Sequence, residues 1–484
     1  MANIDGIGAR ARSEPDSIAL IAPGASATFG ELDARQRSLA GGLRAEGLAP
    51  RDRVGIYSSN RIESLEVSIA VLRAGFVPVP INPLLTAPEV SYVLEDSGTK
   101  LLFTDQDVEP GPSLQQVITF GDAYERYVHE ASAVALCDVA LGRPMHYTSG
   151  TTGSPKGVWV EPHNEARASA LSQSFRDLWG IVDTDVHLVC SPLAHSAPHR
   201  FALRTLEAGG SVVLQGRFSG PETLAAIELF GVTSTFMVPT HLERIFSLGR
   251  QALARHDLSS MRLLAHAGAP IREATKREAL EMFPERSVWE FYGSTEGQAT
   301  RISPEEWLAR PSSVGRALPG GEVVIAGDDG NELGVGEVGW VWVRDPSAER
   351  WEYWGDAGKT RSAWSGDAFC VGDLGSLDDE RYLYLAGRGD DTIITGGVNV
   401  YPLEVESVLS SHPSVAEALV YGVANEEWGQ EVRALVVPAP NQPLDADLLR
   451  EWAREHLAGY KCPRLIELVD DLPRTPTGKL QRRF

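Results

Sequence analysis

Cysteine is scarce in this sequence. Its 484 residues include four thiols, which lie far apart at Cys137, Cys190, Cys370 and Cys462. They form neither a CxxC pair nor a Cys/His set with the spacing of a zinc site. His195 and His199 are four residues apart, but Pro198 lies between them and the glutamate of an HExxH motif is absent. Scattered thiols of this kind are typical of the reducing cytoplasm, where we expect the protein to reside.

Basic residues and long apolar runs are also lacking. The 44 Lys and Arg residues are outnumbered by 66 Asp and Glu, which gives a formal net charge of −22. This balance argues against nucleic acid or an anionic membrane as the main partner, because both favour the opposite sign. No apolar run approaches the roughly 20 residues that span a bilayer. The N-terminal sequence Met-Ala-Asn-Ile-Asp has no basic stretch followed by an apolar one, so no signal peptide is expected.

Apolar residues alternate between strand and helix patterns over much of the chain. A strand-like run at 54–57 precedes an apolar helical stripe at 62–72, which Asn60 is predicted to cap, and a second strand follows at 76–81. The same alternation recurs between 211 and 291. A pattern of this kind predicts β-sheets that are covered by helices.

The pattern changes in the last third of the chain. Residues 322–343 resemble β-hairpins, and a compositional break at 387–391 is followed by a compact α+β pattern. We therefore expect an α/β protein with two domains. The N-terminal domain, residues 1–387, would contain helix-covered sheets and a β-rich subdomain, and residues 388–484 would form a small α+β C-terminal domain.

The most informative segment runs from Tyr147 to Gly157, Tyr-Thr-Ser-Gly-Thr-Thr-Gly-Ser-Pro-Lys-Gly. Its glycines, hydroxyl groups and lysine could bring backbone N–H groups and positive charge to a polyphosphate. It is not a Walker A loop, because Ser154 and Pro155 separate Gly153 from the lysine. A surface turn rich in small polar residues is the alternative interpretation.

A second lysine motif can be set aside on sequence grounds. Gly358 to Thr360 is the only Gly-Lys-Thr in the chain, but Tyr353 stands where a Walker A loop requires its first glycine.

The segment at 147–157 resembles the pyrophosphate-binding signature of the adenylate-forming enzymes, which include acyl-CoA synthetases, amino-acid adenylation domains and luciferases. The pattern is closest to the acyl- and aryl-CoA ligases, and the resemblance extends from about Ala27 to the C-terminus. It implies a mobile C-terminal domain and the use of ATP, Mg²⁺ and coenzyme A. It also implies that the β- and γ-phosphates are held by a phosphate loop made of Thr148, Ser149, Gly150, Thr151, Thr152, Gly153 and Lys156.

Two further segments match the family's nucleotide site. In Tyr292-Gly-Ser-Thr-Glu296, the resemblance implies that Thr295 contacts the α-phosphate, Glu296 coordinates Mg²⁺ and the Tyr292 ring stacks on adenine. Taken alone, this segment could also be an ordinary helix start. Gly268, Ala269 and Pro270 match the segment that lies against adenine, although a strand-to-helix turn with Pro270 as first helical residue fits the same sequence.

Asp373 and Arg388 match the ribose-binding positions. The resemblance implies that Asp373 binds the ribose hydroxyls, that Arg388 contacts ribose or phosphate, and that Asp390 is the hinge between the domains. A tight acidic turn is the alternative for the segment around Arg388. Where the family usually has Arg or Lys and Thr or Ser before Gly-Asp, this chain has Cys370 and Val371, so contacts from those side chains are in doubt.

The C-terminal part supplies the remaining positions. Gly396 and Gly397 match the glycine pair that shapes the pantetheine tunnel, although a β-hairpin turn is also possible. Lys479 matches the lysine that bridges the attacking carboxylate and the α-phosphate. Repulsion between two unit charges at about 4 Å is roughly 4 kcal/mol at an effective dielectric constant of 20, and one cation offsets much of it. The alternative for Lys479 is a solvated residue near a basic tail that includes Arg482.

The acyl substrate is less readable. His195 resembles the gate histidine of acyl- and aryl-CoA ligases, and no acidic residue lies near it in the sequence to bind an amino acid's ammonium group. Arg200 and Arg204 could pair with a second carboxylate or with CoA phosphates, but solvent exposure is the favoured interpretation. A hydrophobic or aromatic acid is suggested by four apolar residues, Met237, Val238, Trp289 and Phe291.

The expected activity is that of an ATP-dependent carboxylic acid–CoA ligase, which forms an acyl-adenylate and then a thioester. The first alternative is a stand-alone enzyme that loads the phosphopantetheine thiol of a carrier protein. The second is a nucleotide-binding protein without catalysis, which would be expected to lack Lys479, Glu296 or Asp373, whereas all three are present.

Overall fold

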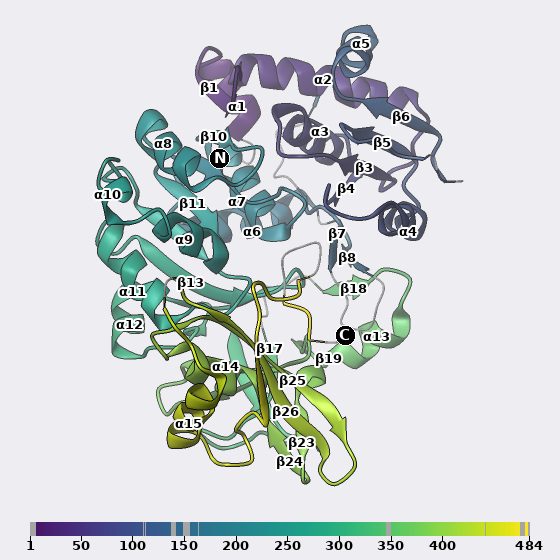
Figure 1. Ribbon diagram of the computed structural model, residues 1–484. Coiled ribbons are helices and arrows are strands. Elements are labelled where there is room, and N and C mark those ends of the chain that lie inside the picture. The colour runs from purple at the N-terminus through teal and green to yellow at the C-terminus, as the bar shows by residue number, and fades with distance from the viewer. Residues whose placement is uncertain are drawn as a thin grey trace.

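The computed structural model describes most of the chain, namely residues 6–109, 111, 113–136, 142–148, 155–162, 164–344, 350–440, 442–474 and 480–482. The described residues form five β-sheets of nine, six, five, four and three strands. Figure 1 shows the N-terminal elements at the top and the C-terminal sheet at the bottom. None of the helices in the described part has the length and apolar character needed to cross a membrane.

The largest sheet is parallel at its centre and antiparallel at its edges. In spatial order its strands are β15 (Arg316–Ala317), β14 (Gln298–Ile302), β13 (Val288–Gly293), β12 (Leu263–His266), β11 (Ser234–Met237), β9 (Val186–Val189), β10 (Ser211–Leu214), β1 (Ile18–Ala22) and β2 (Ala25–Thr28). Neighbouring residues along one strand enter different cores, since Leu188 packs in one cluster and Val189 in another. The sheet is therefore buried on both faces, as expected for parallel strands.

Helices supply the apolar surfaces that cover this sheet. They are α1 (Gly6–Ser13), α2 (Phe29–Ala45), α6 (Glu165–Trp179), α7 (Ser196–Ala208), α8 (Gly220–Phe230), α9 (Pro239–Phe246), α10 (Arg250–Leu253), α11 (Glu273–Met282) and α12 (Pro304–Ala309). The end signals of α8 follow from the sequence: the Ser219 side chain accepts a hydrogen bond from the Glu222 N–H, and Gly231 ends the helix in the left-handed region.

A second, fully parallel sheet lies beside the first. Its strands, in spatial order, are β4 (Val77–Ile81), β3 (Arg53–Tyr57), β5 (Leu101–Thr104) and β6 (Gln116–Thr119). The associated helices are α3 (Ile62–Arg73), α4 (Ala87–Ser97) and α5 (Asp122–Glu130), which Figure 1 shows around these strands.

The prediction that Asn60 caps α3 is wrong. The cap residue is Arg61, whose backbone N–H donates to Ser64 Oγ at 3.3 Å. The Asn60 amide instead reaches the large sheet: Nδ2 donates to the carbonyls of Ser191 and Gln215, at 2.9 and 3.0 Å, and Oδ1 accepts from the Leu193 N–H at 2.8 Å. Asn60 therefore joins the two parallel sheets, because the backbone groups at the strand ends are better partners than its own helix.

The smaller sheets complete the N-terminal part. The three-stranded sheet consists of β18 (Trp351–Tyr353), β8 (Lys156–Val160) and β7 (His146–Thr148). The six-stranded antiparallel sheet consists of β16 (Glu322–Ala326), β17 (Gly339–Arg344), β19 (Trp364–Ser365), β20 (Ala368–Phe369), β21 (Asp373–Leu377) and β22 (Leu383–Arg388), and the short helix α13 (Ala357–Ala363) leads into it.

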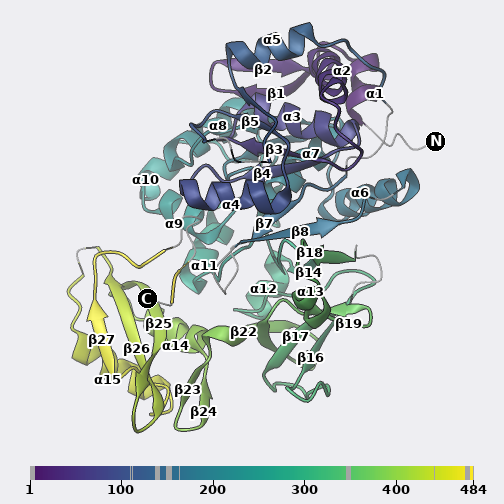
Figure 2. The same ribbon diagram turned by 90° about the vertical axis from the view of Figure 1, so that its right-hand side faces the viewer.

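The C-terminal residues form a separate domain. A 3₁₀ turn, η1 (Gly389–Asp391), is followed by β23 (Ile393–Thr395), β24 (Val398–Val400), α14 (Pro402–Ser410), β25 (Val415–Asn425), β26 (Gly429–Pro438), α15 (Ala446–His456) and β27 (Leu465–Leu468). This domain has its own core, in which Val405, Val420 and Leu449 are inaccessible to solvent. Figure 2 shows it set apart from the rest, with β22 leading toward it. The mixed α/β fold with a distinct C-terminal domain confirms the expected fold class.

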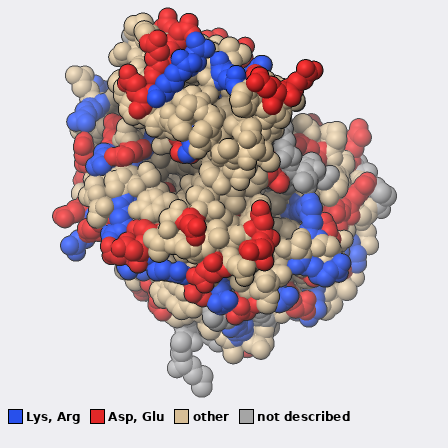
Figure 3. Space-filling model, turned by 90° about the horizontal axis from the view of Figure 1, so that it is seen from below, with Lys and Arg blue, Asp and Glu red and all other residues tan. Residues whose placement is uncertain are grey.

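The surface carries both signs of charge. Figure 3 shows acidic and basic side chains interspersed on the face seen from below, without a continuous basic field on that face.

Candidate active site

The ends of the predicted phosphate loop are held by a β-hairpin. Strands β7 and β8 pair antiparallel, with Thr148 opposite Lys156. Tyr147, one residue earlier, donates its hydroxyl to Asp96 Oδ2 on α4 at 2.6 Å. The predicted loop residues between them lie outside the described part of the chain, namely Ser149, Gly150, Thr151, Thr152 and Gly153.

Lys156 lies among charged and aromatic groups. Its ammonium is 4.0 Å from Asp356 Oδ2 and 5.2 Å from the centroid of the Tyr353 ring. Burial lowers the pKa of Lys156 to about 8, and the neighbouring Lys359 ammonium contributes to the decrease, while Asp356 and Glu296 oppose it. A lysine in these surroundings is positioned to accept an anion, which would relieve its repulsion with Lys359.

Thr295 and Glu296 lie in the turn between β13 and β14. Glu296 is only 6% exposed to solvent. Its Oε1 accepts a hydrogen bond from the Tyr353 hydroxyl at 2.7 Å. The guanidinium of Arg143 donates to the backbone carbonyl of Thr295. Two residues distant in sequence therefore fix the turn that carries the predicted α-phosphate and metal contacts.

Glu296 is suited to Mg²⁺ that is bound mainly through a substrate. Mg²⁺ is usually held by one or two carboxylates together with substrate phosphates and water. Within the described residues no group of three or more His, Cys, Asp or Glu side chains could hold a metal ion, so a complete protein cage is not seen there. A buried carboxylate that accepts only hydrogen bonds fits the substrate-dependent arrangement.

Asp373 and Arg388 form an ion pair across adjacent strands. Arg388 Nε lies 2.9 Å from Asp373 Oδ1, and the Tyr292 hydroxyl donates to Asp373 Oδ2 at 2.5 Å. Burial and the Asp373 charge raise the pKa of Tyr292 well above its ordinary value, so its hydroxyl stays protonated. Burial acts to lower the pKa of Arg388, but the charge of Asp373 and the charges of other groups, including Glu296, outweigh it. The pKa of Arg388 is therefore raised. The predicted ribose and metal positions thus act on one another electrostatically.

Gly268, Ala269 and Pro270 follow β12, whose last residue is His266. Gly268 has φ of +90°, a region that favours glycine. The alternative placing of Pro270 at the first position of a helix is wrong, because α11 begins at Glu273 with Arg272 as its cap.

Three buried side chains, those of His266, Lys276 and Glu290, form an ionic cluster next to this turn. The Lys276 ammonium on α11 contacts His266 Nε2 and lies 3.4 Å from Glu290 Oε2 on β13. Burial lowers the pKa of Lys276 to about 8. The pKa of His266 is lowered mainly by burial and also by the charge of Lys276. The imidazole is therefore neutral. The cluster links α11 to β12 and β13, the two strands that precede the predicted adenine and metal segments.

His195 is the N-cap residue of α7, next to an aromatic cluster. The pKa of His241 is lowered to about 3, mainly by burial. The charges of Arg244 and then of His195 contribute to the decrease, so His195 acts electrostatically on His241. The aromatic cluster contains Phe175, Trp179, Phe201, Phe236 and Phe291, together with Val238 and Trp289. The predicted apolar neighbourhood is therefore present for Val238, Trp289 and Phe291, whereas Met237 packs in a different core cluster.

The prediction that Arg204 faces solvent is wrong. Arg204 and Glu207 form an ion pair in which the Glu207 side chain is inaccessible to solvent, and Ser172 also donates to Glu207 at 2.5 Å. Arg200 is half-buried, with its guanidinium carbon 5.8 Å from the centroid of the Phe175 ring. Glu207 therefore links α7 to α6, and the charge of Arg204 is paired with Glu207 within α7 rather than directed at solvent.

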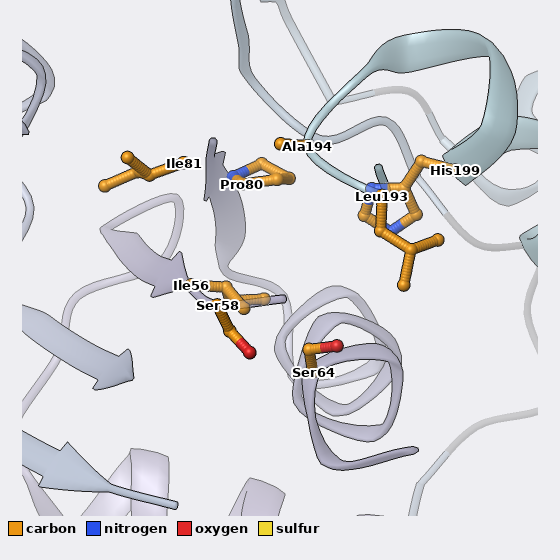
Figure 4. Close-up of a pocket in the computed structure, with 8 residues that line it drawn as sticks. All are labelled: Ile56, Ser58, Ser64, Pro80, Ile81, Leu193, Ala194 and His199. Carbon is orange, nitrogen blue, oxygen red and sulfur yellow. The ribbon is translucent and has the colours of Figure 1, made fainter. Parts of the chain in front are cut away.

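Figure 4 shows a small cavity between the two parallel sheets. Its volume is about 10 Å³, and its wall includes Pro80, Leu193 and His199. His199 Nε2 lies 2.8 Å from Ser68 Oγ, and the ring of His146 is 5.4 Å from that of His199. A cavity of this size accommodates about one water molecule and not an acyl chain.

The C-terminal positions show mixed outcomes. Gly396 and Gly397, with φ of +57° and +79°, form the turn of the β23–β24 hairpin, as the alternative interpretation proposed. Lys479 lies outside the described residues. Arg482, close to it in sequence, is only 16% exposed and pairs with Glu406 at 2.8 Å and with Asp391 of η1 at 3.4 Å. Arg482 is therefore held against the C-terminal domain by two carboxylates, and the alternative for Lys479 stays untested.

Sequence reasoning missed three residues of this site: Arg143, Tyr353 and Lys359. Lys359 is the lysine of the Gly-Lys-Thr segment that was set aside because it does not match a linear Walker A template, and Tyr353 is the residue that stands in place of the template's first glycine. Nothing in the local sequence around Arg143 indicates its contact with the Thr295 carbonyl, since the two residues belong to distant segments.

Comparisons with known proteins give a consistent assignment. The family model described as AMP-binding enzyme matches residues 8–351, and the AMP-binding enzyme C-terminal domain matches residues 404–479. The fatty acid–[acyl-carrier-protein] ligase ScoC of Streptomyces coeruleorubidus is 33% identical, over 98% of this chain and 93% of the relative. The feruloyl-CoA synthase of an Amycolatopsis species is 34% identical, over 98% of this chain and 97% of the relative.

Solved structures agree with the sequence matches. The o-succinylbenzoate–CoA synthetase of Bacillus subtilis, solved with its acyl-adenylate intermediate, superposes with a TM-score of 0.86 at 31% identity, over 99% of this chain and 97% of that one. The same enzyme with ATP and magnesium ion gives the same score and identity, over 99% and 98% of the two chains. The chain belongs to the AMP-binding enzyme family.

Proposed function

We propose that this protein is an ATP-dependent carboxylic acid–CoA ligase that works through an acyl-adenylate. One observation carries the proposal. Lys156, Glu296 and the Asp373–Arg388 pair come from separate segments, yet Tyr353 contacts both Lys156 and Glu296, and Glu296 acts on Arg388. A triphosphate, a metal and a ribose are bound together by such a set of groups.

In the first half-reaction, a carboxylate oxygen of the acid attacks the α-phosphorus of ATP, and the bond to pyrophosphate breaks. Lys156 offers positive charge to the departing phosphates. Asp373 accepts hydrogen bonds from the ribose hydroxyls, and its ion pair with Arg388 holds it in place. Lys479 offsets repulsion between the two anions that react. Mg²⁺, held by Glu296, would reduce the negative charge of the phosphates.

In the second half-reaction, a thiolate attacks the acyl carbonyl and AMP leaves with the oxygen that came from the acid. We propose that residues 388–484 rotate about Asp390 between the two steps, so that Gly396 and Gly397 face the thiol substrate. Support comes from the pairing of Arg482 with Asp391, which links the segment around Lys479 to the proposed hinge.

The acid is proposed to be hydrophobic or aromatic and not an amino acid. The aromatic cluster, to which Ala197 and Phe201 of α7 contribute, supports this choice, and His195 is the N-cap residue of the same helix. The relatives that are named for ferulate and o-succinylbenzoate agree with an aromatic acid.

Coenzyme A is the favoured thiol, and a carrier protein is the alternative. Relatives of both kinds match this chain with similar identity, since the ScoC relative is named for an acyl-carrier protein and the Amycolatopsis relative for CoA. A cytoplasmic location, inferred from the scattered cysteines, and the absence of a nucleic-acid partner, inferred from the net charge, stay predictions.

The proposal is tested by measuring pyrophosphate release over a panel of organic acids with Mg²⁺ and ATP. Each active acid is then offered CoA or a phosphopantetheinylated carrier protein, and the thioester is detected by mass spectrometry. We expect release with aromatic acids and thioester formation on CoA. Thioester on the carrier protein alone would establish the alternative, and no release with any acid would refute catalysis of this type.

A further inference from the structure

A cavity of about 330 Å³ opens beside the predicted phosphate loop. Its wall includes Lys156 of β8, Asp96 of α4 and Lys359 of α13. Asp356, the residue directly before α13, also lines it. A cavity of this volume is within the range of small-molecule sites. Polar and charged groups dominate its lining, which fits an anionic occupant better than an acyl chain.

Two ammonium groups meet in this cavity. The side chains of Lys156 and Lys359 are close enough for direct interaction, and their repulsion contributes to the lowered pKa of Lys156. The carboxylate of Asp356 lies 4.0 Å from Lys156, while its Oδ1 accepts the backbone N–H of Lys359 at 2.9 Å. Asp96 accepts the Tyr147 hydroxyl at 2.6 Å. Asp356 offsets part of the repulsion between the two ammonium groups, and an anionic ligand bound between them would offset more of it.

Hydrogen bonds connect the backbone around Lys359 to Glu296, the proposed Mg²⁺ ligand. Thr360 follows Lys359 in the chain. Its hydroxyl donates a hydrogen bond to the Asp356 carbonyl at 2.8 Å and accepts one from the backbone N–H of Tyr353 at 3.0 Å. Tyr353 in turn donates its hydroxyl to Glu296. A series of hydrogen bonds thus connects the backbone around Lys359 to Glu296, so that a phosphate group bound by the two lysines would lie near the carboxylate.

We propose that Lys359 is a second phosphate-binding lysine, which acts with Lys156 on the terminal phosphates of ATP and on the departing pyrophosphate. The inference rests on the proposed function, since that function supplies a pyrophosphate to be held. Gly358-Lys-Thr360 is not a Walker A loop, yet it contributes its lysine to the phosphates from a different backbone arrangement. AMP lacks the β- and γ-phosphates, so Lys359 distinguishes ATP and pyrophosphate from AMP.

The test compares Lys359→Met with Lys359→Arg and with Arg361→Met. Arg361 is an exposed cation on the same short helix, and its removal is the matched control. Titration calorimetry of the whole protein measures the affinities for magnesium pyrophosphate and for AMP. A hydrogen bond to a charged group corresponds to roughly a 10- to 100-fold change in affinity. We expect Lys359→Met to weaken pyrophosphate binding by about this factor and to leave AMP binding unchanged.

Lys359→Arg should recover most of the affinity, and Arg361→Met should retain all of it. Pyrophosphate affinity within twofold of wild type in Lys359→Met would overturn the inference, and so would equal weakening of AMP and pyrophosphate. Failure of the proposed function has a different signature: wild type would release no pyrophosphate with any acid, whereas the calorimetric comparison would still decide the role of Lys359.

Discussion

The hydrogen bond from Tyr353 to Glu296 offers a sharp test of the proposed metal site. Tyr353→Phe removes the hydroxyl, which lies 2.7 Å from the Glu296 carboxylate, and keeps the ring that lies beneath Lys156. A hydrogen bond to a charged group contributes about 1.5–3 kcal/mol. If this free energy positions Glu296 for Mg·ATP, kcat/KM for Mg·ATP should fall roughly 10- to 100-fold, at 1.4 kcal/mol for each factor of ten.

The assay is acid-dependent pyrophosphate release at a series of Mg²⁺ concentrations. We expect the variant to need more Mg²⁺ for half-maximal rate. Tyr382→Phe is the control, because the Tyr382 hydroxyl donates to Glu306 at 2.9 Å outside the candidate site. Wild-type kcat/KM in Tyr353→Phe at every Mg²⁺ concentration would refute the reasoning. An equal loss in Tyr382→Phe would refute it too, since the effect would then come from general destabilisation.

Three further predictions concern lysines. Lys479→Ala should lower adenylation by on the order of 10²–10³ and retain thioester formation from supplied acyl-adenylate, and equal loss of both half-reactions would contradict its role. Lys276→Met leaves Glu290 buried without its partner, so denaturant titration should show about 3–5 kcal/mol less stability, with recovery in Lys276→Met/Glu290→Gln. Lys156 is charged below its pKa of about 8 and neutral above it, so kcat/KM for Mg·ATP should decrease as pH rises through 8; a pH–rate profile that is flat there would exclude this titration.

The regular elements were predictable because their signals are local. The helix at 220–230 carries its signals in its own segment, with the capping Ser219 directly before it and Gly231 directly after it. The motif around Glu296 was predictable for the same reason. Strand pairing could not be read from the sequence, so the ion pair of Asp373 with Arg388 and its hydrogen bond from Tyr292 were not predicted, although family resemblance implied that all three residues bind the nucleotide.

The errors arose where a side chain has a partner that the local sequence pattern does not reveal. Asn60 has a suitable helix beside it, but the carbonyls of Ser191 and Gln215 compete successfully for its amide. Arg204 looks solvent-facing on a helical wheel, although Glu207 lies buried beneath it. The approach of Lys359 on α13 to Lys156 on β8 could not be read from the sequence either, because the two lysines belong to separate segments.

In the proposed first half-reaction the carboxylate of the acid attacks the α-phosphorus of ATP. The decisive measurement gives the enzyme an active acid labelled with ¹⁸O in both carboxylate oxygens, together with ATP and CoA, and follows the label into the products by mass spectrometry. We expect one ¹⁸O atom in AMP and none in pyrophosphate. Label in a phosphate product, with formation of ADP, would show that the acid attacks the γ-phosphorus and would refute attack at the α-phosphorus.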